Sequence, residues 1–100
     1  GVVNDQRILP EGWVDLTTTP TEASLKSRAY AAQFWLNQPA ASPMMPHIPN
    51  DAFAARGHYG QSTFIIPSRD LVVVRMGQTF NTKAWDMEGF LIDLLAALPQ

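Results

Sequence analysis

The chain has 100 residues, a formal net charge of −2, 46% hydrophobic and 16% charged residues, a composition typical of one small globular domain or of a piece of a larger one. The basic residues form no cluster, which argues against a nucleic-acid-binding surface, and the lack of cysteine excludes disulfides and thiolate metal sites. His47 and His58 have no ligand spacing, and no apolar run approaches the roughly 18 residues of a membrane span, so the sequence predicts no metal, no cofactor, no signal peptide and no membrane-spanning segment.

The first half of the chain predicts little regular structure. Pro10 and Glu11 are typical of a first helical turn, so we expect a short helix from Pro10 to about Thr17. The aromatic stretch Tyr30–Leu36 predicts a strand. Residues 37–51 contain four prolines and predict a loop of a length that is uncommon unless the loop is functional. The opening GVVNDQRILP, without an initiator Met or a leader, is consistent with a start inside a longer protein.

The next part of the chain predicts three antiparallel strands. We expect strands over Ala52–Gly57, Gln61–Ile66 and Leu71–Met76. His58–Gly60 forms the first turn, and Pro67–Asp70 has the residues of a type I turn. Strands joined by such short connections must be antiparallel neighbours.

The stretch NTKAWDMEGFLIDLLAALP predicts a helix that ends before Pro99. Asn81 or Thr82 is its expected cap. Its apolar positions recur with helical spacing and predict one buried stripe. The stripe consists of Met87, Phe90, Leu91, Leu94 and Leu95.

Two apolar runs predict a sheet that is covered on both faces. Leu71–Val74 and Phe64–Ile66 do not alternate with polar residues, so we expect both faces of these strands to be buried. One amphipathic helix covers one face only, and the short helix near Trp13 is too small to cover the other. The sequence therefore predicts an α+β fold with an antiparallel sheet of three to four strands, a C-terminal helix on one face and a missing layer on the other. The partner that supplies this layer would be the upstream part of the same domain or another copy of the chain.

These segments together resemble a known family. RILPEGWVDLTTTP, YAAQFWLN and FAARGHYGQSTFIIPSRDLVVVRMG, followed by a helix, look like the C-terminal portion of a serine β-lactamase-related hydrolase, in its penicillin-binding/esterase-like, 6-aminohexanoate-dimer hydrolase-like branch. The most specific part is the Gly-His-x-Gly-Gln tract followed by an apolar strand, Pro-x-x-Asp-Leu and VVVR. The resemblance implies that residues 1–100 are a C-terminal segment of one β-lactamase/transpeptidase-like domain with no internal boundary, in which helices flank an antiparallel sheet.

The chemistry of this family is acyl transfer through a serine ester. A Ser-x-x-Lys motif supplies the nucleophile and a lysine, and a Tyr-x-Asn motif shares the proton transfer. A third motif, Lys-Thr-Gly or a variant, lies on a strand at the cleft, and the residue after its glycine offers a backbone N–H to the oxyanion hole. This chain contains neither Ser-x-x-Lys nor Tyr-x-Asn. The resemblance therefore implies that the nucleophile lies upstream and that only the third motif can be present here.

Two registers of the third motif are open. If the triplet His58–Gly60 takes its place, Gln61 offers the N–H. If the triplet Ala55–Gly57 takes its place, His58 offers the N–H, and the next two residues complete a tight turn while both strands keep their lengths. We prefer this second register. Gly57 then allows the substrate to approach the backbone closely.

The resemblance then assigns a set of site residues. Arg56 stands at the middle position of the triplet and not at that of the lysine, which favours a small-molecule ester or amide substrate over a penicillin. The catalytic residues are His58, through its backbone N–H, and Gly57, and the substrate-binding residues are Arg56, Tyr59, Gly60 and Gln61. Simpler interpretations remain, because His58 can be an ordinary turn histidine and Gln61 can clamp the hairpin backbone. Arg75 is expected to be a charge at a strand end.

Three functions are open on this basis. The first is a segment of a serine hydrolase that acts on ester or amide bonds through an acyl-enzyme and is inactive alone. The second is a binding module that docks a partner on its sheet, and the third is a catalytically silent relative with a structural role. A Ser-x-x-Lys motif in the upstream gene sequence would favour the first over the third.

Overall fold

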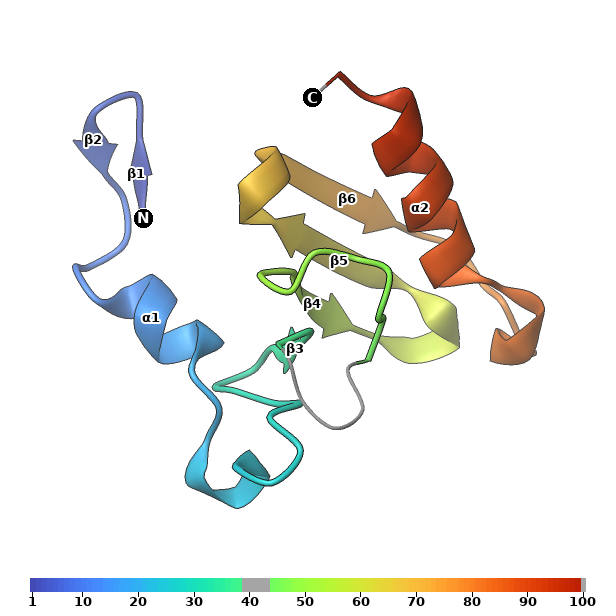
Figure 1. Ribbon diagram of the computed structural model, residues 1–100, viewed down its shortest axis with the longest axis horizontal. Helices are drawn as coiled ribbons and strands as arrows, with labels where there is room; N and C mark the ends of the chain where they lie inside the picture. The colour runs from blue at the N-terminus through green and yellow to red at the C-terminus, as the bar shows by residue number, and fades with distance from the viewer. Residues whose placement is uncertain (39–43, 100) are drawn as a thin grey trace.

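The computed structural model describes residues 1–38 and 44–99. Figure 1 shows a C-terminal body of strands and a helix, with the N-terminal elements set to one side. In chain order the elements are β1 (Val2–Val3), β2 (Gln6–Arg7), α1 (Trp13–Thr18), β3 (Trp35–Leu36), β4 (Phe53–Arg56), β5 (Ser62–Ile66), β6 (Leu71–Arg75) and α2 (Met87–Ala97). Short 3₁₀ turns are formed by Glu22–Ser24, His58–Gly60, Pro67–Arg69 and Thr82–Ala84. Of the helices within these ranges, none combines the length and the apolar character needed to cross a membrane.

The main sheet has four antiparallel strands in the order β3-β4-β5-β6. Its register places Ala54 opposite Phe64 and Phe64 opposite Val73. Neighbouring strands are also neighbours in sequence, as expected for strands joined by the predicted turns at His58–Gly60 and Pro67–Asp70. The predicted α+β class, with an antiparallel sheet and a C-terminal helix, is confirmed.

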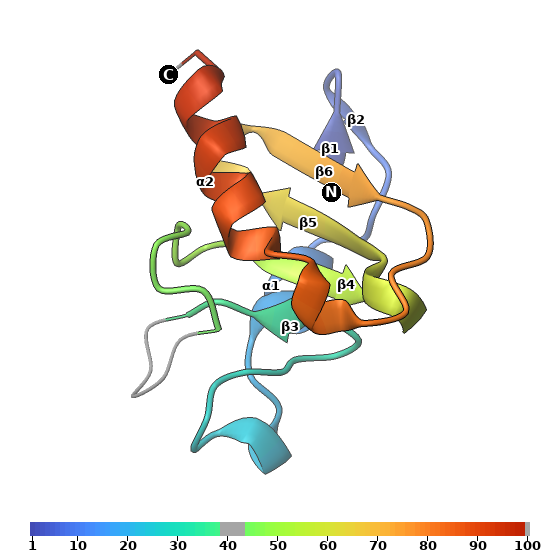
Figure 2. The same ribbon diagram turned by 90° about the vertical axis from the view of Figure 1, so that its right-hand side faces the viewer.

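The core lies between the sheet and α2. Figure 2 shows α2 crossing in front of the strands. Side chains alternate along a strand, so every second residue faces the helix. Phe64 and Leu91 are 1% and 0% exposed, and full burial of such a side chain contributes roughly 1.5–3 kcal/mol. The buried cluster comprises Met45, Ile48, Ala52, Ala54, Phe64, Ile66, Val73, Met87, Leu91 and Leu95.

Within the described residues, the opposite face of the sheet is exposed along β6, whereas Ile65 on β5 is partly buried. Val72 and Val74 on β6 are 60% and 58% exposed, whereas Val73 between them is 9% exposed. The apolar run Leu71–Val74, for which the sequence predicted burial on both faces, is thus covered by α2 on one face only. In Figure 2 the N-terminal elements lie behind the sheet, but they leave these valines accessible.

The predicted strand Tyr30–Leu36 is wrong in extent, because only Trp35 and Leu36 form a strand. The chain reverses between Tyr30 and Trp35, with the Ala31 N–H donating to the Phe34 carbonyl over 2.9 Å. Gln33 has a φ of 74°, which an extended strand does not contain. The rings of Tyr30 and Trp35 pack edge to face at 4.9 Å, so the aromatic residues stabilise a tight turn.

Both predicted helices begin later than expected. Gly12 has a φ of 79° and precedes α1, so Pro10 belongs to a turn and not to the helix. The last helix is interrupted, because Asn81 caps only the 3₁₀ turn Thr82–Ala84. Asp86 then caps α2 by accepting from the Gly89 N–H over 2.9 Å.

The predicted apolar stripe of the last helix is correct apart from one residue. Met87, Leu91 and Leu95 are buried, and Leu94 packs against their cluster. Phe90 is 40% exposed. It lies beside the indole of Trp85, with the ring centroids 5.5 Å apart.

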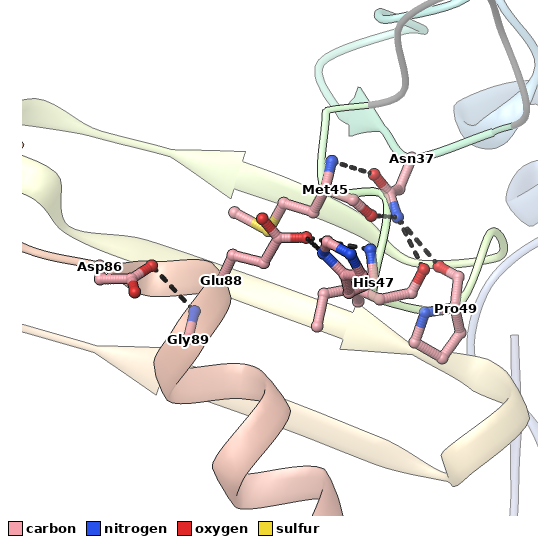
Figure 3. Close-up of polar contacts among 8 residues, drawn as sticks. Asn37, Met45, His47, Pro49, Asp86, Glu88 and Gly89 are labelled. Atoms are coloured by element: carbon pink, nitrogen blue, oxygen red, sulfur yellow. Dashed lines mark hydrogen bonds and ion pairs between the residues drawn. The ribbon is translucent and has the colours of Figure 1, made fainter.

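The proline-rich loop is fastened to the core by one buried amide. Asn37 is 1% exposed, and its Nδ2 donates to the carbonyls of Met45, Ile48 and Pro49 while its Oδ1 accepts from the Met45 N–H (Figure 3). Such a network satisfies backbone groups that burial would otherwise leave unpaired. Part of the predicted loop, residues 39–43, lies outside the described residues.

A second contact ties this loop to the start of α2. Glu88 accepts from the backbone N–H of His47 over 3.0 Å, and the His47 ring nitrogen Nδ1 lies 3.2 Å from the same carboxylate oxygen (Figure 3). A carboxylate in the first turn of a helix is also favoured by the helix dipole. The loop and the N-terminal end of α2 are therefore held together on the same side of the sheet.

The open sheet face generates a prediction. We expect the 100-residue chain to bind a hydrophobic dye or to self-associate, and the double substitution Val72→Thr/Val74→Thr to reduce both while changing stability by less than about 0.5 kcal/mol, as for exposed positions in general. Dye fluorescence, analytical ultracentrifugation and thermal melts measure these effects. The matched control is Val73→Thr, which places a hydroxyl in the core and should cost about 1–3 kcal/mol. A clean monomer that binds no dye contradicts the expectation.

Candidate functional site

All of the predicted site residues, 56–61, line one hollow with a volume of about 330 Å³. They come from the end of β4 and from the turn that joins β4 to β5. The other wall is formed by Thr82, Trp85 and Met87, which lie in and after the connection from β6 to α2. Phe64 adds a buried aromatic side chain to the lining. The hollow thus lies between the hairpin turn and the beginning of α2.

The carbonyl groups of the turn are held by hydrogen bonds within the chain. His58 accepts at its carbonyl from the Gln61 N–H over 3.3 Å, and Tyr59 accepts from the Thr79 N–H over 3.0 Å. The Gly57 N–H donates to the Gln61 carbonyl over 2.8 Å. By contrast, the backbone N–H of His58 makes no hydrogen bond to residues 1–38 or 44–99. An N–H of this kind, at the end of a strand and beside a hollow, is free to bind an oxygen of a ligand.

Tyr59 adopts a backbone conformation that residues with a side chain rarely take, with a φ of 60°. Its ring lies 3.8 Å from the His58 ring and 5.1 Å from that of Phe80, centroid to centroid. Phe80 itself is 76% exposed. Tyr59 therefore both lines the hollow and packs over the turn.

Gln61 clamps the backbone of the hairpin, as its simpler interpretation proposed. Its Nε2 donates to the His58 carbonyl over 3.1 Å, and its Oε1 accepts from the Gly77 N–H over 3.2 Å. Both ends of the carboxamide are thus occupied by backbone groups. Its assignment as a substrate-binding residue remains a prediction.

Arg56 is exposed and its Nη1 lies 3.2 Å from the sulfur of Met44 in the proline-rich loop. The guanidinium therefore lies at the border between the hollow and that loop. Ser62, next along the wall, has a buried hydroxyl oxygen without a hydrogen-bond partner in the part of the chain that the structure describes. The hollow offers one cation, that of Arg56, whereas the Ser62 hydroxyl is buried in its wall, and nothing in its lining forms a nucleophile–lysine pair.

Sequence reasoning missed the contribution of Arg75. Its side chain is half-buried, and its Nη1 donates to the carbonyls of Gly60 over 3.0 Å and of Tyr59 over 3.3 Å. Its guanidinium carbon lies 4.6 Å from the centroid of the Trp85 ring, a distance typical of a cation–π contact. The alternation along β6 could have revealed this, because Arg75 lies two residues after Val73 and thus on the helix-covered face.

Sequence reasoning also missed the second wall. Thr82, Trp85 and Met87 were assigned to one continuous helix, in which their side chains would not have been expected to face the hairpin turn. The break at Asp86 places Trp85 in an extended conformation. A helix-capping aspartate five residues after Asn81 is the sequence signal that could have indicated this break.

Neither metal ligands nor a similar protein of known function identifies what the hollow binds. Within residues 1–38 and 44–99, no group of three or more His, Asp or Glu side chains is arranged to hold a metal ion. Searches with the chain found no matching family model, no matching curated protein and no matching solved structure.

The close contact between Gly60 and Arg75 generates a prediction. Gly60 has a φ of +76°, and a Cβ there would lie 3.1 Å from Arg75 Nη1. Gly12 has nearly the same φ, +79°, but a Cβ there would meet nothing within 4 Å. A side chain in this conformation costs roughly 1–2 kcal/mol, so we expect Gly12→Ala to lose at most that amount and Gly60→Ala to lose more in denaturant unfolding.

The contact itself is tested by repeating Gly60→Ala in an Arg75→Lys background, where the additional loss should shrink. Equal losses for the two glycine variants, or an additional loss that is the same in both backgrounds, would show that the contact with Arg75 does not contribute.

Proposed function

We propose that this chain is part of a serine hydrolase of the β-lactamase-related family that acts on ester or amide bonds through an acyl-enzyme. The observation that carries the proposal is the backbone N–H of His58, which has no hydrogen-bond partner among residues 1–38 and 44–99 and lies two residues after β4, on the lining of the hollow. A serine oxygen that attacks an acyl carbon creates an oxyanion, which backbone N–H groups stabilise. The nucleophile, its lysine and a second N–H donor would come from outside these residues.

The hairpin geometry supports the preferred register of the third motif. β4 ends at Arg56, and His58–Gly60 forms a 3₁₀ turn. The triplet Ala55–Gly57 then lies at the end of a strand, as the motif requires, whereas the triplet His58–Gly60 lies wholly in the turn. His58 in this register is the donor, and Gly57 leaves room for the substrate beside the backbone.

The remaining residues have distinct roles in this proposal. Tyr59 and Gly60 form the rim of the hollow, and Gln61 maintains the turn by its two backbone contacts. Arg56, which is exposed and lies near Met44, is the residue that meets a polar part of the substrate. The indole of Trp85, which is partly exposed, provides an apolar surface for an acyl chain.

A binding function is the second candidate, and the open sheet face favours it. Val72 and Val74 present apolar side chains that nothing in the described chain covers. In the hydrolase this face is covered by another part of the same domain. In a binding module it is covered by a partner or by a second copy of the chain.

The first test is activity of the chain alone. We expect no turnover of a p-nitrophenyl ester above background, because the chain has no Ser-x-x-Lys motif. The full-length protein assayed in parallel is the positive control, and it should hydrolyse the ester if the proposal is correct. If the rigorously purified 100-residue chain hydrolyses the ester, the nucleophile does not lie upstream and this part of the proposal is wrong.

The second test separates the backbone of His58 from its side chain in the full-length protein. His58→Ala keeps the N–H and should change kcat little. His58→Pro removes the N–H and should lower kcat by roughly 100- to 1,000-fold, the usual effect of losing one oxyanion donor. Circular dichroism and thermal melts must show that both variants are folded. A loss of about 100-fold in a folded His58→Ala variant would assign the role to the imidazole instead.

A further inference from the structure

The two walls of the hollow are connected by one guanidinium group. On the turn side, Arg75 Nη1 donates to the carbonyls of Tyr59 and Gly60. On the other side, the guanidinium carbon lies over the Trp85 ring, 4.6 Å from its centroid. Nη2 donates to the hydroxyl of Thr79, in the connection that runs between the two walls. A single side chain therefore contacts each part that encloses the hollow.

The turn needs such support because its conformation is unfavourable by itself. Tyr59 has a φ of 60° and Gly60 a φ of 76°, and a side chain at the first position makes this region sparsely populated. The Thr79 N–H donates to the same Tyr59 carbonyl that accepts from Arg75. The end of β6 and the segment that follows it thus hold the turn in place, and Arg75 is the charged member of this contact.

The charge of Arg75 is directed at the turn and not at an acidic side chain. Among the described residues, Arg75 forms no ion pair with a carboxylate. Its hydrogen bonds go to carbonyl and hydroxyl oxygens. A guanidinium supplies five N–H donors in a fixed plane that can also stack on an indole, whereas the ammonium of a lysine is a single point of charge without this plane.

We propose that Arg75 is the positioning residue of this site, which fixes the turn His58–Gly60 relative to Trp85 and thereby orients the His58 N–H. Its part in acyl transfer rests on the proposed function. The positioning itself does not, since it follows from the contacts of Arg75 with both walls.

The experiment compares Arg75→Lys with Arg69→Lys in the full-length protein. Arg69 is a suitable control because it is also half-buried and also donates to a backbone carbonyl, that of Leu95 over 3.0 Å, at the opposite end of the sheet. Hydrogen exchange is followed by mass spectrometry in peptides that cover residues 57–61 and 77–80. A peptide that covers α1, residues 13–18, which contains neither arginine and contacts neither of them, is the internal reference.

We expect Arg75→Lys to accelerate exchange in the first two peptides by roughly 10- to 100-fold, the range that corresponds to lost hydrogen bonds to a charged group. Arg69→Lys should leave these peptides unchanged. In the hydrolysis assay, Arg75→Lys should lower kcat by roughly 10- to 100-fold with little change in KM, since a misplaced donor weakens binding of the transition state and not of the substrate. Arg69→Lys should keep both constants.

The exchange and kinetic results separate the two proposals. Unchanged exchange at residues 57–61 in Arg75→Lys overturns the positioning role, whatever the activity. Accelerated exchange with an unchanged kcat shows that the turn is not part of the reaction and overturns the catalytic half of the inference. If the full-length wild-type protein hydrolyses no ester or amide, the proposed function fails, and the exchange result alone decides the positioning.

Thr79→Val replaces Arg75→Lys if that variant does not unfold cooperatively. It removes the hydroxyl that accepts from Arg75 but retains the backbone N–H that donates to Tyr59. We expect the same direction of change in the same peptides. Exchange equal to that of the wild type overturns the proposal here as well.

Discussion

Helix α2 meets the sheet through Met87, Leu91 and Leu95, and most other features follow from this contact. These side chains share one buried cluster with Ala54 and Phe64 of the sheet. Because the helix must lie along this face, the segment before it has to pass the turn at the end of β4. The packing that stabilises the fold therefore also brings Thr82 and Trp85 opposite the hairpin turn, and it creates the hollow.

Polar contacts then fix the relative position of the two walls, which the apolar packing only brings close to each other. Hydrophobic burial is not directional, so it can bring two walls together without determining the distance between them. The hydrogen bonds of Arg75 and Gln61 supply that direction at the turn. Asp86 does the same at the start of α2, where it caps the helix. The site is thus formed by an apolar core on one side and by a small number of oriented donors and acceptors around it.

The parts of the fold that the sequence predicted are those with strong local signals. The turn His58–Gly60 and the strands on both sides were predicted because apolar runs flank a glycine-rich polar tract. The prediction of a strand over Tyr30–Leu36 was wrong in extent. Aromatic residues favour strands because their side chains pack on a sheet surface, but here the rings of Tyr30 and Trp35 pack on each other across a turn. Propensity alone does not distinguish these two arrangements.

The candidate site was predictable on one wall only. Residues 56–61 are contiguous, so a single motif could place them together. The other wall depends on how α2 lies on the sheet, which is a tertiary contact between residues far apart in sequence. Arg75 was interpreted as a charge at a strand end because its partners are the backbone carbonyls of Tyr59 and Gly60, and such partners leave no pattern in a sequence.

The buried amide of Asn37 restricts sequence variation at position 37 much more than in the loop to which it is hydrogen-bonded. Its hydrogen bonds go to peptide groups of Met45, Ile48 and Pro49, so they place no demand on which side chains the loop carries at its exposed positions. Position 37 itself has almost no freedom. Aspartate has the same shape, but it would set an acceptor against three carbonyl oxygens where Nδ2 now donates. In the evolution of this chain, the loop can therefore diverge in sequence and still keep its path, provided that one asparagine is retained.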